Sequence, residues 1–160
     1  VKVIHDALRE RGSDRCNYGV SLDSDAFIRT SESLSAIVTD YGLDQDMQIM
    51  FSQEYHFEEG LRKDQQHFIN GGFFIVRNSP EGLKILDDWY NVPETHEDMA
   101  HLKKENPQGL NLCWDRKMQP KYHDVTVLGS SQLFTAPLGL VIRHNWFKDL
   151  RFEQEMQDVL

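Results

Sequence analysis

The chain has 160 residues, a length that suits one domain with a sizeable hydrophobic core. Hydrophobic residues make up 39% of the sequence and charged residues 27%, values typical of folded globular domains and not of disordered chains. A net charge of −9 argues against a general affinity for nucleic acid or anionic membranes, and no apolar run approaches the roughly 20 residues of a membrane span. We therefore expect neither nucleic acid nor membrane as a partner of this segment.

The first half of the chain alternates between helical and extended patterns. Apolar residues at helical spacing predict helices over 2–11 and 34–41, and alternating or continuous apolar runs predict strands over 18–22, 47–51 and 71–76. The polar stretch 52–69 is expected to form a long loop before the last of these strands.

The second half begins with a strong helix signal. The segment Asn78-Ser79-Pro80-Glu81 combines a cap, an early proline and an acidic first turn, which predicts a helix with Trp89 on its buried face. The polar stretch 93–111 is expected to be irregular, apart from a short helix around 97–104. The later elements are predicted as a helix over 112–118, strands over 125–128 and 140–142, and a final amphipathic helix that ends at Leu160. Because strands and helices mix throughout without a linker, residues 1–160 are expected to form one domain of the α/β class.

Two aspartates one residue apart, Asp23 and Asp25, follow the predicted strand 18–22. Ligands of open α/β sheets bind beyond the carboxyl ends of strands. Along an extended chain both side chains point the same way, with Ser24 opposite, so they can share a Mg²⁺ or Mn²⁺ ion that keeps positions open for phosphate oxygens. An Asx turn is the alternative. The segment Asp44-Gln45-Asp46 has the same spacing, but it precedes a strand and is interpreted as a solvated loop.

A second candidate segment, Asn70-Gly71-Gly72, leads into a predicted buried strand. Glycines let a ligand approach the backbone, and the asparagine amide offers both a donor and an acceptor. A bulge at the start of the strand explains the same residues without a ligand. Farther along, Asp115 beside Trp114 is typical of a sugar-binding pair in which the ring stacks on the sugar, and a helix with one buried tryptophan is the alternative.

A third candidate segment follows the predicted strand 140–142. His144 can complete a carboxylate–metal site, and the basic residues Arg143 and Lys148 can neutralise phosphate oxygens. A purely structural histidine is the alternative, and the residues alone leave the two open.

The order of these segments resembles GT-A-fold glycosyltransferases, in particular the Golgi galactosyl-, mannosyl- and xylosyltransferases and related nucleotide-diphospho-sugar transferases. LDSDAFI is similar to the Asp-x-Asp segment of that family, INGGFFIVRNSPEGLKILDDWY to its Asn-[Ser/Thr]-Gly segment, and IRHNWFKD to its late histidine motif. The resemblance implies a mixed sheet flanked by helices and a location in the Golgi lumen. It also implies metal-dependent transfer of a hexose or pentose from a nucleotide-diphospho-sugar to a glycan or other acceptor, with retention of configuration.

The same resemblance implies roles for individual residues. The implied ligands of Mn²⁺ (or Mg²⁺) are Asp23, Asp25 and His144; the implied donor- and substrate-binding residues are Asp23, Ser24, Asn70, Gly71, Gly72, Arg143 and Lys148; and the implied catalytic residues are Asp115 and Asn70.

The chain departs from the family pattern in three places. The family's base-binding strands have no counterpart before the first helix, so we expect a partial domain that corresponds to the C-terminal two-thirds of the fold. Arg116 stands where the family often has Gln, and Gly71 stands where it has Ser or Thr. Two other functions stay open: a non-catalytic binding domain of the same fold, and a metal-dependent phosphohydrolase, which requires further carboxylates at strand ends.

Overall fold

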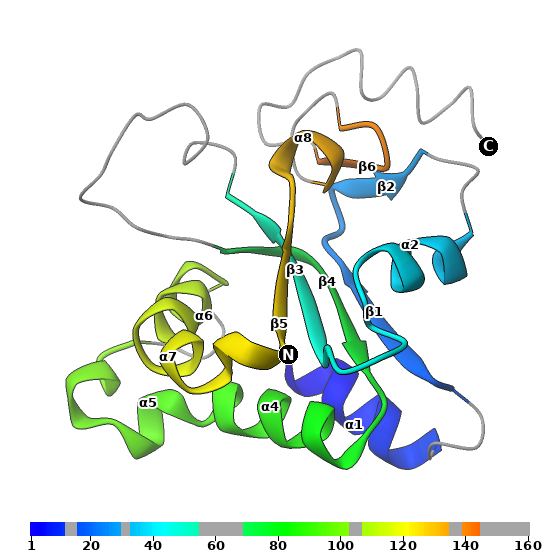
Figure 1. Ribbon diagram of the computed structural model, residues 1–160. Helices are drawn as coiled ribbons and strands as arrows, with labels where there is room; N and C mark the ends of the chain where they lie inside the picture. The colour runs from blue at the N-terminus through cyan, green and yellow to red at the C-terminus, as the bar shows by residue number, and fades with distance from the viewer. Residues whose placement is uncertain (12–15, 30–32, 55–68, 103–106, 135–138, 145–160) are drawn as a thin grey trace.

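The computed structural model describes residues 1–11, 16–29, 33–54, 69–102, 107–134 and 139–144. At its centre lies a four-stranded mixed sheet in the order β1 (Tyr18–Leu22), β4 (Ile69–Arg77), β3 (Ile49–Gln53) and β5 (Thr126–Gly129). β4 runs antiparallel to β1 and β3, and β3 runs parallel to β5. The carboxyl ends of β1, β3 and β5 therefore lie on the same side as the amino end of β4 (Figure 1). We call this side the carboxyl edge.

A second, two-stranded sheet lies beside the carboxyl edge (Figure 1). It consists of β2 (Ala26–Ile28) and β6 (Ile142–His144), which run antiparallel. β2 follows β1 after a short turn, and a further backbone hydrogen bond from Arg29 N to Val141 O, 2.8 Å long, extends the pairing. The small sheet thus brings a late segment of the chain next to the end of the first strand.

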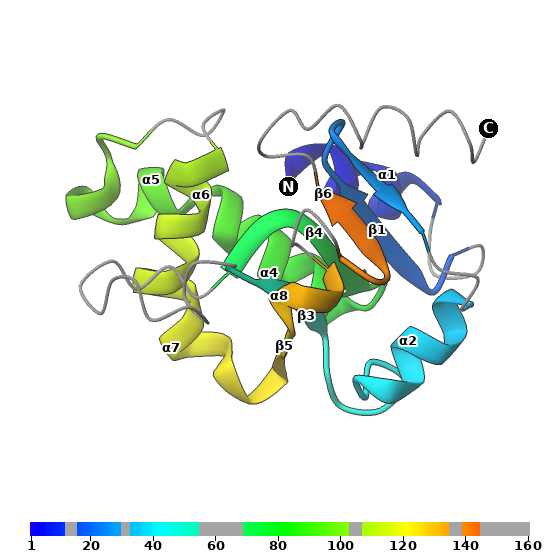
Figure 2. The ribbon, with the colours of Figure 1, turned by 90° about the horizontal axis from the view of Figure 1, so that it is seen from above.

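Helices cover both faces of the four-stranded sheet, as Figure 2 shows from above. One face is covered by α1 (Lys2–Arg11), α4 (Pro80–Tyr90), α5 (Val92–Thr95), α6 (Pro107–Cys113), a π-helix (Trp114–Met118) and α7 (Gln119–Tyr122); the other is covered by α2 (Leu34–Asp40) and α8 (Ser131–Phe134). Short 3₁₀ turns occupy Glu97–Met99 and His123–Val125. Within the described ranges, no helix combines the length and apolar character that crossing a membrane requires.

Each face of the sheet has its own hydrophobic core, because neighbouring residues of a strand point to opposite sides. On β3, Phe51 faces the core under α4 and α6, whereas Met50 faces the core under α2 and α8. On β4, Phe74 and Ile75 divide in the same way. These buried strands explain why GGFFIV is continuously apolar in the sequence.

The predicted start of the helix after β4 is confirmed. Ser79 is the N-cap of α4 and its Oγ accepts a hydrogen bond from Gly82 N at 2.9 Å, while Pro80 occupies the first helical position. Proline suits the first helical position because an N–H group there would have no acceptor within the helix, so its absence costs no hydrogen bond.

The structure corrects several expected boundaries. In the described part of the stretch 93–111, α5, α6 and a short 3₁₀ turn replace the expected irregular structure, and Pro93 and Pro107 stand in the first turns of α5 and α6, where proline favours a helix. β2 was not expected at all, β3 continues to Gln53, and β6 begins at Ile142 instead of ending there. The predicted final helix near Leu160 and most of the polar loop 52–69 lie outside the described residues.

Candidate functional site

The Asp23–Asp25 segment forms a tight turn at the carboxyl edge. It connects β1 to β2, and Ala26 N donates a 3.1 Å hydrogen bond to Asp23 O, which closes the turn. Asp23, Ser24 and Asp25 are all exposed. A turn is therefore present, as one interpretation of the sequence held, and it also presents two acidic residues to solvent at the edge where α/β proteins bind ligands.

Two backbone contacts tie this turn to the other candidate segments. Asp23 N donates to Gly72 O at 2.8 Å, which joins it to the start of β4. In the small sheet, His144 is the direct register partner of Ala26, the residue after Asp25. The backbones of the three segments named in the sequence thus meet at one place. The side chains of Arg143 and His144, and all of Lys148, lie outside the described residues.

The start of β4 contains the bulge that one interpretation of Asn70-Gly71-Gly72 predicts. Phe51 pairs with Phe74, but the next residue, Ser52, pairs with Asn70, so β4 carries extra residues at this point. The Asn70 side chain holds the bulge: its Oδ1 accepts from Gly72 N at 2.9 Å, and its Nδ2 donates to Glu54 Oε2 at 3.2 Å. Asn70 is buried, and both ends of its amide are used inside the protein.

Glu54 is an acidic residue at the carboxyl edge that the sequence prediction missed. It directly follows β3 and is half-buried. Because the strand was expected to end at residue 51, the sequence prediction placed Glu54 inside a polar loop. The feature that could have identified it is a carboxylate that closely follows the buried run IMF. Its hydrogen bond from Asn70 gives it a part in fixing the bulge.

Trp114 and Asp115 lie in the π-helix that follows α6. The Trp114 ring is fully buried, with its centroid 4.4 Å from that of Phe51 and 5.3 Å from that of Trp89. The interpretation of Trp114 as a platform for a sugar ring is therefore wrong, because the aromatic core already covers it. Asp115 is half-buried and Arg116 is exposed. Single π-helical turns within α-helices occur frequently at functional sites.

The turn offers two carboxylates, the type of ligand that a hard divalent cation prefers. Carboxylate oxygens are the ligands that Mg²⁺ and Mn²⁺ prefer, and Asp23 and Asp25 are exposed on one turn. Among the side chains that the structure describes, no group of three His, Cys, Asp or Glu residues could hold a metal ion. His144, the third ligand that the resemblance implies, is described only in its backbone.

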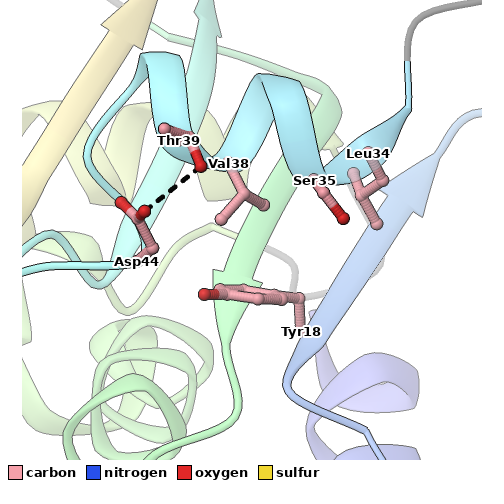
Figure 3. Close-up of a pocket in the computed structure, with 6 residues that line it drawn as sticks. All are labelled: Tyr18, Leu34, Ser35, Val38, Thr39 and Asp44. Atoms are coloured by element: carbon pink, nitrogen blue, oxygen red, sulfur yellow. Dashed lines mark hydrogen bonds between the residues drawn. The ribbon is translucent and has the colours of Figure 1, made fainter.

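The second aspartate pair lies at the opposite edge of the sheet. Asp44 accepts a 3.1 Å hydrogen bond from Thr39 Oγ1, and Asp46 precedes β3. Figure 3 shows the pocket here, with a volume of about 250 Å³, lined by Tyr18, Leu34, Ser35, Val38, Thr39 and Asp44. Typical ligand pockets begin at about 300 Å³, so this hollow is small for a nucleotide sugar. The interpretation of this pair as part of a surface loop agrees with its exposure.

Comparison with known proteins supports the fold. No protein-family profile and no curated protein sequence matches the chain. A solved structure does: a glycosyltransferase involved in the glycosylation of the major capsid of PBCV-1 superposes with a TM-score of 0.63. The chain therefore has a glycosyltransferase-like fold. The superposition covers 98% of this chain and 72% of that one at 11% sequence identity, so the likeness concerns the α/β architecture and not a particular family.

Proposed function

We propose that this chain is a metal-dependent glycosyltransferase that moves a hexose or pentose from a nucleotide-diphospho-sugar to a glycan or other acceptor. One observation carries the proposal: the Asp23–Asp25 turn, the bulge at Asn70-Gly71-Gly72 and the backbone of His144 meet at the carboxyl edge. The glycosyltransferase-like fold supports it independently.

In the proposed site the turn binds the diphosphate end of the donor. Asp25 and Asp23 hold Mn²⁺ or Mg²⁺ with His144, and Ser24 lies in the same donor-binding turn. The cation neutralises the negative charge that grows on the diphosphate as the glycosidic bond breaks. Arg143 and Lys148 add positive charge to the same phosphates.

The other residues of the site position the sugar. Gly71 and Gly72 line the sugar and acceptor pocket, and Asn70 shapes it by holding the bulge. Asp115 faces the transferred sugar from the π-helix. Transfer proceeds with retention, so the departing phosphate oxygen accepts the proton of the acceptor hydroxyl and no separate strong base is needed on the opposite face.

The test is calorimetric Mn²⁺ binding in the presence of UDP and then GDP. We expect the wild-type chain to bind Mn²⁺ only when one of the two nucleotides is present, which also identifies the nucleotide of the donor. The Asp25→Asn variant should lose this binding by at least tenfold, because it removes a charged ligand.

The chain offers a matched control for this substitution. Asp44→Asn changes an exposed aspartate of the same Asp-x-Asp spacing at the opposite edge, and it should bind as the wild type does. Equal loss in both variants, or no binding by the wild type, would contradict the proposed function. Release of free sugar from the matching nucleotide sugar would then separate a transferase from a domain that only binds.

A further inference from the structure

Asn111, on α6, points its amide at the bulge of β4. A Cβ atom placed on Gly71 would lie 2.5 Å from Asn111 Oδ1, 3.5 Å from its Cγ and 3.8 Å from its Nδ2. The amide oxygen therefore occupies the space that any side chain at position 71 would need. Glycine at this position is what allows α6 to bring a polar group so close to the bulge.

The hydrogen-bonding groups of the Asn111 amide are not used by the described part of the chain. The residue is half-buried, and none of the described residues forms a hydrogen bond with its side chain. An asparagine amide has two N–H donors and a carbonyl acceptor, which suits it to bind a hydroxyl group that both donates and accepts. By contrast, the amide of Asn70 is satisfied by Gly72 and Glu54.

Asn111 is linked to both parts of the proposed site, by its contact with β4 and by its place in the sequence before Asp115. Gly71, which it contacts, precedes Gly72, whose carbonyl accepts the hydrogen bond from Asp23 N. Asp115 follows Asn111 by four residues, about one helical turn, in the π-helix. Asn111 therefore contacts the neighbour of the residue that binds the aspartate turn, and it lies about one turn before Asp115.

We propose that Asn111 determines sugar specificity by hydrogen-bonding a hydroxyl group of the donor sugar. This inference rests on the proposed function, since it names a residue of the same site. It assigns binding of the sugar, and not of the nucleotide, to the Gly71–Asn111 contact.

The experiment measures by calorimetry, in Mn²⁺, the dissociation constants of UDP, GDP, UDP-glucose, UDP-galactose and GDP-mannose. The readout is the ratio of the nucleotide-sugar constant to that of its bare nucleotide. In Asn111→Ala we expect this ratio to rise about fivefold for the preferred sugar, the effect of one lost neutral hydrogen bond, while the bare nucleotide binds unchanged. Because no acceptor is present, the effect belongs to the donor sugar.

A second variant and a control keep the result interpretable. Gly71→Ala keeps the asparagine but adds a methyl group 2.5 Å from its amide oxygen, which must then move, so this variant should raise the same ratio. Asn17→Ala, an exposed asparagine before β1, should change nothing. An unchanged ratio in folded Asn111→Ala and Gly71→Ala overturns the inference, as does an equal loss of nucleotide and nucleotide sugar. A wild type that binds neither UDP nor GDP overturns the proposed function itself.

Discussion

Asp88 joins α4 to α7 through one carboxylate. It accepts hydrogen bonds from Lys84 Nζ at 2.8 Å and from the Tyr122 hydroxyl at 2.5 Å, and Lys121 Nζ donates to the same group. Partial burial raises the pKa of Asp88, but the hydrogen bonds from Lys121, Lys84 and Tyr122 outweigh it and lower the pKa to about 2. Only the ionised carboxylate can accept from all three donors.

This lowered pKa makes a prediction for stability against pH. The pKa of Asp88 is below its unfolded value of 3.8, so its contribution is complete above about pH 4 and is lost as the pH falls toward 2. Asp88→Asn should lower the free energy of unfolding at pH 7 by about 1 to 2 kcal/mol, and the difference should nearly vanish at pH 2. Urea unfolding at both pH values measures it. Asp46→Asn, an exposed control, should change stability by less than about 0.5 kcal/mol. If Asp88→Asn lowers the free energy of unfolding by the same amount at both pH values, the prediction is contradicted.

At the scale of elements, the first turn of α4 depends on the absence of a side chain at Gly82. A Cβ atom there would lie 2.1 Å from the carbonyl oxygen of Arg77, which is backbone at the end of β4 and cannot rotate away. The glycine lets the helix begin close against the strand that precedes it. A glycine within a helix is otherwise unfavourable.

We therefore expect Gly82→Ala to destabilise the protein. A clash with a backbone atom should cost about 2 to 3 kcal/mol, the upper part of the range for overpacking, and this exceeds the roughly 1 kcal/mol that alanine gains over glycine in a helix. Thermal or urea unfolding shows directly whether the substitution lowers or raises the free energy of unfolding. Glu81→Ala changes the exposed neighbour in the same turn and should cost less than about 1 kcal/mol, because it removes only a charge near the helix N-terminus. A more stable Gly82→Ala variant would show that the strand end can move.

The same elements show which parts of the fold the sequence can predict. The strand 18–22 and the helix capped by Ser79 have local signals, alternation in one and capping in the other, and both are confirmed. β2 has only three residues and no pattern of its own; it exists because it pairs with β6, more than 100 residues later. The π-helix has no signature that distinguishes it from the predicted helix over 112–118.

At the scale of the whole molecule, the candidate site also has features that the sequence predicts and features that it does not. The rule that ligands bind beyond carboxyl ends of strands selects Asp23 and Asp25 from the sequence. The register that brings Gly72 to Asp23, and His144 to the residue after Asp25, is a long-range property that no local pattern contains. The position of Asn111 cannot be predicted from the sequence for a further reason: its approach to the bulge depends on how α6 packs against β4.

Phe51 of the hydrophobic core packs against the π-helix that carries Asp115 of the candidate site. Its ring lies 4.4 Å from that of Trp114, the residue before Asp115, and 5.3 Å from that of Trp89, with distances measured between centroids. Its neighbour Met50 is equally buried but belongs to the core on the other face of the sheet. Substitutions at these two residues can therefore be compared to distinguish a loss of core stability from a loss of packing against the π-helix.

Phe51→Ala should lower the free energy of unfolding by about 3 to 5 kcal/mol and Met50→Ala by about 2 to 5 kcal/mol, because each leaves a cavity in a buried core. Of the two variants, only Phe51→Ala removes an aromatic ring that packs against Trp114, so only this variant should alter the near-UV circular dichroism that reports the packing of the tryptophans. If Met50→Ala alters that spectrum as much, the two cores are coupled through the sheet. If neither does, Trp89 alone is sufficient to hold Trp114, whose ring centroid lies 5.3 Å from its own, and the π-helix does not depend on β3.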